Sequence, residues 1–209
     1  MAMPAPAALR ILTCRAVLFD MDGTLVDSTS IVEQVWSEFA DRYGLDSAEI
    51  LRTSHGVQAI DTVRRFAPAG ADIEALAAEL GATERARTEG IVPLPGAAAL
   101  LRMLPGHAVA LVTSADRILA DIRMDSAGLG MPSTVVTADV ITRGKPHPEG
   151  YLRAAELLMI DPADALVFED APAGIAAGLA AGIRHQVKAA QALHGNQLAR
   201  AQRVGRRHK

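Results

Sequence analysis

The chain has 209 residues, half of them hydrophobic and 22% charged, a composition typical of a globular protein. Its formal net charge of -3 gives no general reason to expect a nucleic acid or an anionic membrane as a partner. Because the chain has a single cysteine, Cys14, it can form no intrachain disulfide, which favours a reducing compartment.

Residues 1–15 lack the charged start, apolar block and cleavage site of a signal peptide. No later run approaches the roughly 18 apolar residues that a membrane span needs. We therefore expect a cytoplasmic protein that has no membrane partner and works as a monomer.

Four short aliphatic or β-branched runs along the chain are each typical of a buried strand. Their apolar character is nearly continuous rather than alternating, as expected for parallel strands that are covered on both faces. Helix-period segments separate them, so their order indicates an α/β protein with a parallel sheet. Ligands of such sheets bind at the carboxyl ends of the strands. The predicted strands are 16–19, 108–113, 134–137 and 165–168, and the helices among them are 96–104, 116–127 and 148–158.

One stretch, from about residue 28 to residue 89, contains no convincing strand. Its apolar spacing predicts only amphipathic helices. We interpret it as a helical domain that is inserted after the first strand. The predicted helices are 31–43, 57–66 and 73–87. The expected division is a core of residues 1–27 and 92–209 and a helical domain of residues 28–91.

Two acidic residues, Asp20 and Asp22, come directly after the first predicted strand. At this spacing their carboxylates can approach one locus, and Gly23 permits a sharp exit of the chain. Two neighbouring carboxylates repel each other unless a hard cation offsets their charge, so the pair indicates a Mg²⁺ site. A turn with a helix cap is the alternative interpretation of this pattern.

Two other polar residues suggest a phosphate site. Ser114, at the end of the second main strand, offers a hydroxyl group beside backbone N–H groups, although Ser is also an ordinary helix cap. Lys145 stands between Gly144 and Pro146 and is one of three lysines in the chain. Because arginine is the usual cation of this sequence, the isolated lysine suggests a positioned charge for phosphate.

A second acidic pair, Glu169 and Asp170, follows the last clear strand. These side chains could complete the oxygen ligands of a metal ion, whereas a capping role is the alternative for Asp170. The acidic pairs, the hydroxyl group and the lysine all fall at the carboxyl ends of predicted strands. Since polar groups gathered at one sheet edge would each need a partner, this convergence favours a single site.

The ordered motifs DMDGT (20–24), VTSA (112–115), GKP (144–146) and FEDAPAGIAAG (168–178) resemble those of the haloacid dehalogenase superfamily of phosphotransferases. The resemblance covers about residues 15–183 and favours the branch with a helical cap after the first motif. It implies a Rossmann-like parallel sheet core with this inserted cap. Ser54-His55-Gly56 and residues 144–149 are most similar to the glycerol-phosphate and 2-deoxyglucose-6-phosphate phosphatases.

The resemblance implies a magnesium-dependent phosphatase that hydrolyses a small sugar or polyol phosphate through an aspartyl-phosphate intermediate. It makes Asp20 the nucleophile and a Mg²⁺ ligand. Asp22 would be the general acid and then the general base, and its backbone carbonyl would also face the metal. Asp170, assisted by Glu169, would complete the metal site.

The other implied roles concern the substrate. Ser114 and Lys145 would hold phosphoryl oxygens. In the cap, His55 is a candidate substrate contact, with a structural role at a helix end as the alternative, and Gly56 would allow close approach of the backbone.

Other activities need residues that this chain lacks. A β-phosphoglucomutase relies on a cap histidine and arginine, and this chain has Val32 and Ala59 at those places, so water is the expected acceptor. Residues 28–91 contain no lysine for the Schiff base of a phosphonatase. A phosphomutase remains the alternative enzyme, and a non-catalytic descendant that binds a phosphorylated ligand or a partner protein is the alternative outside catalysis.

The C-terminus departs from the family pattern. Relatives continue into another apolar strand after the turn at Gly182, but this chain reads Arg-His-Gln-Val at 184–187, so we expect the last strand to be lost or degraded. Residues 184–209 carry seven of the 21 lysines and arginines. They predict a solvated terminus or, alternatively, an anion-binding arm.

Overall fold

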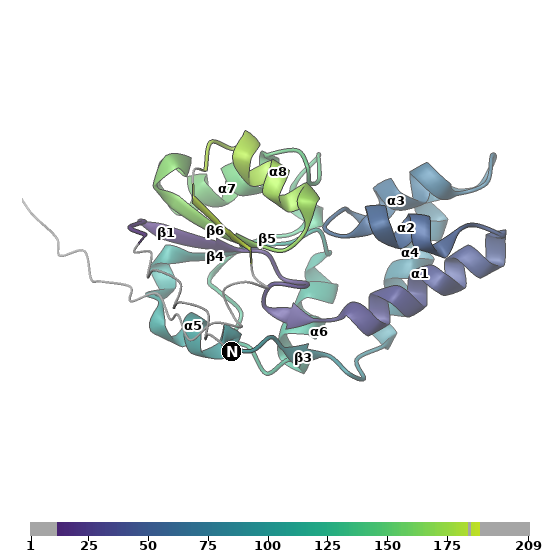
Figure 1. The fold of residues 1–209 in the computed structure, drawn as a ribbon, viewed down its shortest axis with the longest axis horizontal. Helices are drawn as coiled ribbons and strands as arrows, with labels where there is room; N and C mark the ends of the chain where they lie inside the picture. The colour runs from purple at the N-terminus through teal and green to yellow at the C-terminus, as the bar shows by residue number, and fades with distance from the viewer. Residues whose placement is uncertain (1–11, 184, 189–209) are drawn as a thin grey trace, which may run out of the picture.

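The computed structural model describes residues 12–183 and 185–188. At its centre lies a five-stranded parallel sheet in the order β5-β4-β1-β6-β7 (Figure 1). The predicted α/β fold with a parallel sheet is confirmed. The strands are β1 (Ala16–Phe19), β4 (Val109–Val112), β5 (Thr134–Val136), β6 (Ala165–Glu169) and β7 (His185–Lys188).

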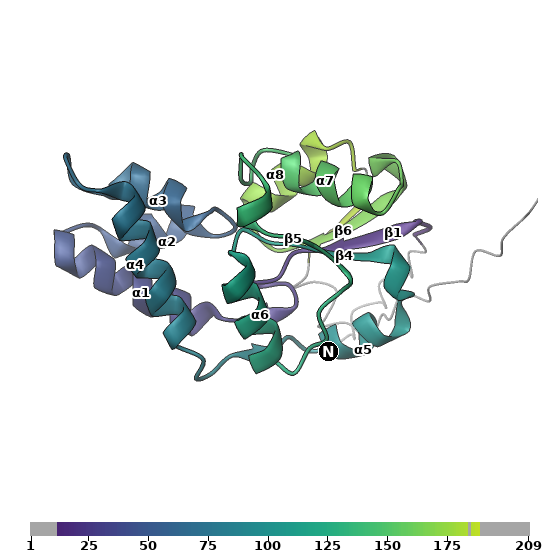
Figure 2. The same cartoon turned by 180° about the vertical axis from the view of Figure 1, so that it is seen from behind.

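Helices cover both faces of the sheet. Figures 1 and 2 show α7 and α8 on one face and α5 and α6 on the other. Alternate residues of β1 therefore enter two different cores, with Val17 and Phe19 in one and Leu18 in the other, because successive side chains of a strand point to opposite faces. This explains the continuous apolar run. The helices are α5 (Ala97–Met103), α6 (Arg117–Ser126), α7 (Glu149–Leu157) and α8 (Pro172–Ala180), with short 3-10 turns at Gly106–Ala108, Ala138–Val140 and Pro162–Asp164.

The expectation that the last strand is lost was wrong. The backbone of β7 pairs in parallel with β6, with Leu166 opposite His185 and Glu169 opposite Lys188. The pairing of an edge strand depends on backbone N–H and C=O groups, so a polar sequence does not prevent it. The basic segment 189–209 lies outside the described residues.

Between β1 and α5 the chain forms a group of helices, which Figure 2 shows beside the carboxyl edge of the sheet. They enclose a core of their own, made by Trp36, Phe39, Ala40, Ile50 and Val63. Two short strands, β2 (Val26–Asp27) and β3 (Val92–Pro93), pair antiparallel where the chain leaves the sheet and returns to it. The helices are α1 (Thr29–Tyr43), α2 (Ser47–Ser54), α3 (Ala59–Phe66) and α4 (Ile73–Ala86).

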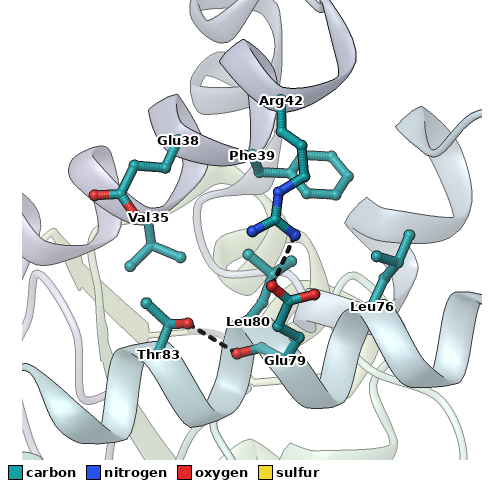
Figure 3. A pocket seen from close by; sticks show the side chains of 8 residues that line it. All are labelled: Val35, Glu38, Phe39, Arg42, Leu76, Glu79, Leu80 and Thr83. Carbon is teal, nitrogen blue, oxygen red and sulfur yellow. Dashed lines mark hydrogen bonds and ion pairs between the residues drawn. The ribbon is translucent and has the colours of Figure 1, made fainter.

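A small hollow lies between α1 and α4, where Arg42 donates to Glu79 at 2.7 Å over apolar side chains such as Val35 (Figure 3). Its volume of about 30 Å³ has room for about one or two waters, which is too little for a metabolite. In the described part of the chain no helix combines the length and the apolar character that crossing a bilayer requires.

Candidate functional site

The strand register brings distant acidic residues together. Phe19 pairs with Phe168 across β1 and β6, and the backbone N–H of Asp20 donates to the carbonyl of Phe168 at 3.0 Å. The two strands therefore end side by side. Carboxylate oxygens of Asp20, Glu169 and Asp170 lie within 4.8 Å of one another, at the carboxyl edge where ligands of α/β sheets bind.

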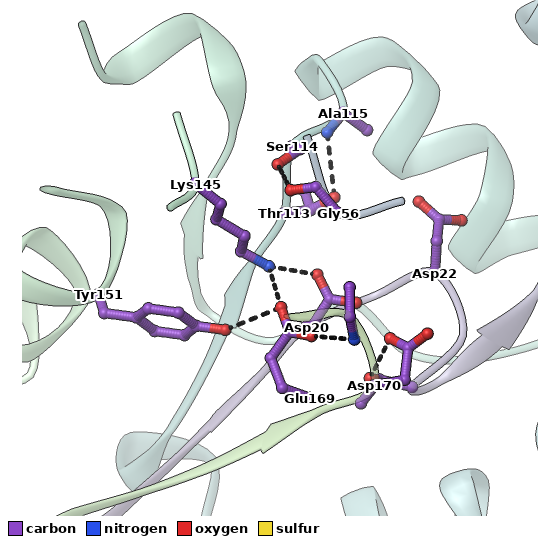
Figure 4. A network of polar contacts seen from close by, with 12 residues as sticks. Asp20, Asp22, Gly56, Thr113, Ser114, Ala115, Lys145, Tyr151, Glu169 and Asp170 are labelled. Atoms are coloured by element: carbon purple, nitrogen blue, oxygen red, sulfur yellow. Dashed lines mark hydrogen bonds and ion pairs between the residues drawn. The ribbon is translucent and has the colours of Figure 1, made fainter. Parts of the chain in front are cut away.

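Lys145 enters this group from the loop before α7. Its Nζ donates to Oδ1 of Asp20 at 2.5 Å and to Oε1 of Glu169 at 2.7 Å, and all three side chains are buried. The other contacts of Glu169 come from the Tyr151 hydroxyl, which donates to Oε1 at 3.3 Å, and from the Ala171 N–H, which donates to Oε2 at 2.8 Å (Figure 4). Both carboxylate oxygens of Glu169 thus accept hydrogen bonds, and the one from Lys145 holds that lysine beside Asp20.

Two glycines of the sequence motifs make room for the carboxylates. A Cβ at position 174 would lie 1.5 Å from Oε1 of Glu169. A Cβ at position 23 would lie 2.2 Å from Oδ2 of Asp170, and Gly23 also has a φ of 78°, which side chains with a Cβ rarely adopt. These positions therefore exclude larger residues for steric reasons that belong to the site.

The carboxylates share one ammonium group. Burial raises the pKa of Asp20 well above its usual value; Lys145 opposes this shift, and the charges of Glu169 and Asp170 add to it. Burial and the charge of Glu169 also raise the pKa of Asp170. Burial alone would lower the pKa of Lys145, but its neighbours, Asp20 first, outweigh burial and raise this pKa well above its usual value.

This donor set fits a divalent cation. Three carboxylates face one lysine, so negative charge is in excess at a buried place. All the ligand atoms on offer are oxygens, which Mg²⁺ prefers. Of the acidic residues predicted as ligands, Asp20, Glu169 and Asp170 are brought together, while the carboxylate of Asp22 is not part of this group.

Asp22 points away from the Lys145 network (Figure 4). Its Oδ1 accepts from the Ser28 hydroxyl and its Oδ2 from Nη1 of Arg123, both at 2.7 Å. Arg123 lies on α6 and is 4% exposed. Arg123 was not among the predicted site residues, yet a signal was present, since it occupies the buried face of α6 beside Met124.

Arg123 also joins the helical group to the sheet side. Its Nη2 lies 3.5 Å from Oε1 of Glu84 on α4, and burial raises the pKa of Glu84 against the opposing charge of Arg123. A second ion pair, between Arg85 on α4 and Asp116, has an N–O distance of 2.5 Å. The contact between α4 and α6 is therefore strongly charged.

Ser114, which is predicted to bind phosphate, contacts the helical group in this structure. The Ser114 hydroxyl donates to the carbonyl of Gly56 at 2.8 Å, and the N–H of Ala115 donates to the Thr113 hydroxyl at 3.1 Å. His55 ends α2 and is exposed. Ser114 and Gly56 thus meet between α2 and the sheet edge, and His55 is the neighbour of Gly56 in the chain.

A cleft of about 300 Å³ separates the helical group from the sheet edge, within the size range of small-molecule sites. The sheet side contributes Asp20, Asp22 and Asp170 to its lining. Val32 and Ala59, the two positions where a mutase would need a histidine and an arginine, line the opposite side. At these two positions the cleft is therefore lined by apolar side chains.

Comparisons with known proteins agree with this arrangement. Residues 14–182 match the family of haloacid dehalogenase-like hydrolases. The chain is 48% identical over 173 residues to hexitol phosphatase A of Escherichia coli, covering 81% of this chain and 80% of that protein. It is 36% identical over 190 residues to glycerol-1-phosphate phosphohydrolase 1 of Saccharomyces cerevisiae, covering 86% and 75%. The crystal structure of β-phosphoglucomutase from Clostridium difficile superposes with a TM-score of 0.74 at 20% identity, covering 87% and 93%, and shares the fold.

Proposed function

Because the chain belongs to the haloacid dehalogenase-like hydrolase family, we propose that it is a magnesium-dependent phosphatase of small sugar or polyol phosphates. Membership of this family confirms the resemblance that the motifs indicated. The observation that carries the proposal is the contact of Asp20 with Lys145 at 2.5 Å, within a group of three carboxylates of which two, Asp20 and Asp170, line a cleft. The relatives named above act on a hexitol phosphate and a glycerol phosphate, which supports the substrate class.

In this proposal Asp20 is the nucleophile. One of its carboxylate oxygens attacks phosphorus, the bond from phosphorus to the substrate oxygen breaks, and an aspartyl phosphate forms. Water then attacks this phosphorus and regenerates Asp20 with release of phosphate. The covalent intermediate divides one difficult hydrolysis into two easier transfers, and Lys145 offsets the repulsion between a carboxylate and a phosphate dianion.

Asp20 and Asp170 would hold Mg²⁺ together with the backbone carbonyl of Asp22, with Glu169 assisting through its hold on Lys145. The bound ion would supply positive charge that stabilises the phosphoryl oxygens in the transition state. The fit rests on the excess of buried carboxylates over ammonium groups.

Asp22 is the proposed general acid and base. It lines the cleft and would give its proton to the departing alkoxide, then take a proton from the attacking water. Such help is worth roughly 10²- to 10⁴-fold in rate. Ser28 and Arg123 hold its carboxylate in this structure, so they are candidates for positioning it.

We further propose that residues 28–91 act as a cap over the core formed by 1–27 and 92–209. The paired β2 and β3 strands lie at its two connections. Closure of such a cap keeps water out of the site at the steps where water would cause side reactions. Ser114 and Lys145 would hold phosphoryl oxygens, which requires Ser114 to release the carbonyl of Gly56. His55 would contact the substrate from the cap side of the cleft.

Water is the proposed acceptor rather than a second sugar phosphate. Val32 and Ala59 line the cleft and cannot donate hydrogen bonds from their side chains to a second phosphate. A phosphomutase would instead produce isomerised sugar phosphate faster than free phosphate.

The test uses purified protein, Mg²⁺ and a panel of p-nitrophenyl phosphate, glycerol 3-phosphate, 2-deoxyglucose 6-phosphate and sorbitol 6-phosphate. We expect phosphate release that a chelator abolishes. Asp20→Asn should abolish turnover, while Asp41→Asn, an exposed aspartate of α1, should retain it. Hydrolysis that persists in Asp20→Asn, or the absence of any chelator-sensitive release, would overturn the proposal.

A further inference from the structure

Three buried polar atoms of the described residues have no hydrogen-bond partner: Oγ of Ser54, Nε2 of Gln58 and Nη2 of Arg123. All three residues line the cleft beside Asp20. Buried polar groups are nearly always hydrogen-bonded, because leaving them unpaired is costly. Nη2 of Arg123 still has an ion pair with Glu84, so of these three atoms those of Ser54 and Gln58 are the two without any partner. Two such exceptions at one cleft indicate a ligand that supplies the missing partners.

Ser54 is the last residue of α2 and is 6% exposed. The hydroxyl of its neighbour Thr53 donates to the carbonyls of Glu49 and Ile50. The helix backbone therefore provides a hydrogen-bond partner for the hydroxyl of Thr53 but not for that of Ser54. The unpaired hydroxyl belongs to the residue that lines the cleft.

Gln58 precedes α3 and reaches the loop that carries Lys145. A Cβ at Gly144 would lie 2.8 Å from its Cγ and 3.2 Å from its Nε2, so the side chain of Gln58, amide nitrogen included, packs where position 144 has no side chain. This contact fixes the stem between α3 and that loop and leaves the amide nitrogen without a partner.

Arg123 and Glu84 supply a donor and an acceptor at the same cleft. Nη1 of Arg123 is bound to Asp22, whereas its Nη2 has only the ion pair with Glu84 at 3.5 Å. A hydroxyl group both donates and accepts, so it can bind Glu84 and Arg123 together. Since Asp22 is the proposed donor to the departing oxygen, this pair lies next to the leaving group.

The described lining of the cleft offers no free arginine or lysine to an anionic leaving group. Among the described residues that line it, Arg123 is the only arginine or lysine, and it is paired with two acids. Five carboxylates line the same cleft, those of Asp20, Asp22, Glu84, Asp116 and Asp170. Asp116 is already paired with Arg85 and Asp20 with Lys145, so these cations too are occupied when a second carboxylate or phosphate of a substrate enters the cleft.

We propose that Ser54, Gln58 and the Glu84–Arg123 pair form a subsite for the leaving group that binds the hydroxyls of a neutral polyhydroxylated chain and rejects anionic leaving groups. The subsite rests on the proposed phosphatase function and extends it. A polyol offers a hydroxyl on each carbon, which matches polar groups on three separate elements. These are the unpartnered hydroxyl of Ser54 on α2, the unpartnered amide nitrogen of Gln58 before α3, and the ion pair of Arg123 on α6 with Glu84. An aromatic leaving group would leave the same atoms unpaired.

The first experiment uses the unmodified protein and two substrates of similar size, 2-hydroxyethyl phosphate and phosphoglycolate, which differ by one oxygen atom and by the charge of the leaving group. We expect kcat/KM to favour the neutral alcohol at least tenfold and to rise further for glycerol 3-phosphate and sorbitol 6-phosphate. A preference for phosphoglycolate, or equal kcat/KM for the pair, would overturn the subsite.

The second experiment compares Ser54→Ala and Gln58→Ala with Thr53→Ala and Gln34→Ala, whose side chains do not line the cleft. The readout is the ratio of kcat/KM for sorbitol 6-phosphate to that for p-nitrophenyl phosphate. Loss of one hydrogen bond should lower this ratio about five- to tenfold in the two subsite variants, and the controls should keep it. An unchanged ratio in both subsite variants contradicts the inference.

Failure of the proposed function gives a different result, namely no phosphate release from any compound, including p-nitrophenyl phosphate. Calorimetric titration of the same wild-type protein and variants with sorbitol 6-phosphate and phosphoglycolate then decides the subsite. We expect tighter binding of the polyol phosphate that Ser54→Ala weakens. Tighter binding of phosphoglycolate would overturn the subsite in that case also.

Discussion

Arg123 holds Asp22 through a hydrogen bond of 2.7 Å between Nη1 and Oδ2, although the two residues lie on different elements and Arg123 is almost completely buried. A buried arginine between two carboxylates is an arrangement in which removal of the cation leaves unpaired charges. The proposed general acid is thus held by a residue that does not touch the carboxylate group around Asp20 and Lys145.

Arg123→Leu should therefore affect both stability and catalysis. Loss of one partner from a buried pair costs about 3–5 kcal/mol, and the urea midpoint should fall accordingly. The kcat for sorbitol 6-phosphate should fall at least tenfold, within the range that general acid–base help provides. The kcat for p-nitrophenyl phosphate should fall less, because nitrophenolate departs without a proton.

Arg117→Leu is the matched control, since Arg117 lies on the same helix and pairs with Asp121 in an exposed ion pair. Such pairs contribute roughly 0–1 kcal/mol. Arg123→Lys should recover part of the kcat because it keeps the charge. An equal loss for both substrates, or no recovery with lysine, would show that Arg123 stabilises the fold without positioning Asp22.

Mg²⁺ should stabilise the folded protein by binding to the carboxylate group of Asp20 and Asp170. In its absence burial, together with the charge of Glu169, disfavours the ionised forms of both residues and raises their pKa values. Asp170→Asn removes one charge, so this variant should melt at a higher temperature than the wild type without Mg²⁺ and should lose most of the rise that Mg²⁺ causes. Thermal melts with and without the ion measure both effects. A full Mg²⁺ response in Asp170→Asn would contradict the assignment.

The same carboxylates give the stability a dependence on pH. A carboxyl whose pKa is raised in the folded state binds protons there more tightly than in the unfolded chain. The destabilisation caused by its ionised form is absent below the pKa of the unfolded chain and complete above the pKa of the folded protein. The metal-free protein should therefore lose stability as pH rises between these two pKa values. Because the pKa values of Asp20 and Asp170 are raised, stability should fall, and not rise, with increasing pH.

Protons and Mg²⁺ compete for these oxygens, so the stabilisation by Mg²⁺ should grow over the same pH range. Melting temperatures between pH 4.5 and pH 7.5, with and without the ion, test this prediction. Stabilisation by Mg²⁺ that grows as the pH falls would contradict this prediction.

Much of the fold could be predicted from local patterns. The run at 16–19 and the other three core strands were visible because parallel strands with two covered faces are continuously apolar. Three short elements were missed. β2 and β3 have two residues each, too few for any periodicity, and α2 has eight, although Asp46 and Glu49 offered an N-terminal capping signal.

The site was predictable where motifs stand at strand ends, as for Asp20 and Asp170, whereas Lys145 was recognised from its isolated place between Gly144 and Pro146 in a loop. Contacts across the cleft were not predictable, because they depend on how α4 packs against α6. The Arg123–Glu84 pair joins residues of two separate helices, and no spacing in the sequence relates them. The β7 strand was misjudged because its pairing rests on backbone groups that every residue type carries.

Gly174→Ala should disable the site through Glu169. Gly174 lies on α8, where alanine would ordinarily favour the helix, but a Cβ there would lie 1.5 Å from Oε1 of Glu169. Overpacking of this kind costs typically 1–3 kcal/mol, and the displaced carboxylate would release Lys145. We therefore expect a lower melting temperature and a loss of kcat of at least tenfold, since Lys145, the residue proposed to hold phosphate, moves. Gly106→Ala, where a Cβ would meet open space, is the control and should change neither. Normal kcat in Gly174→Ala, measured on folded protein, would show that Glu169 does not position Lys145 for the reaction.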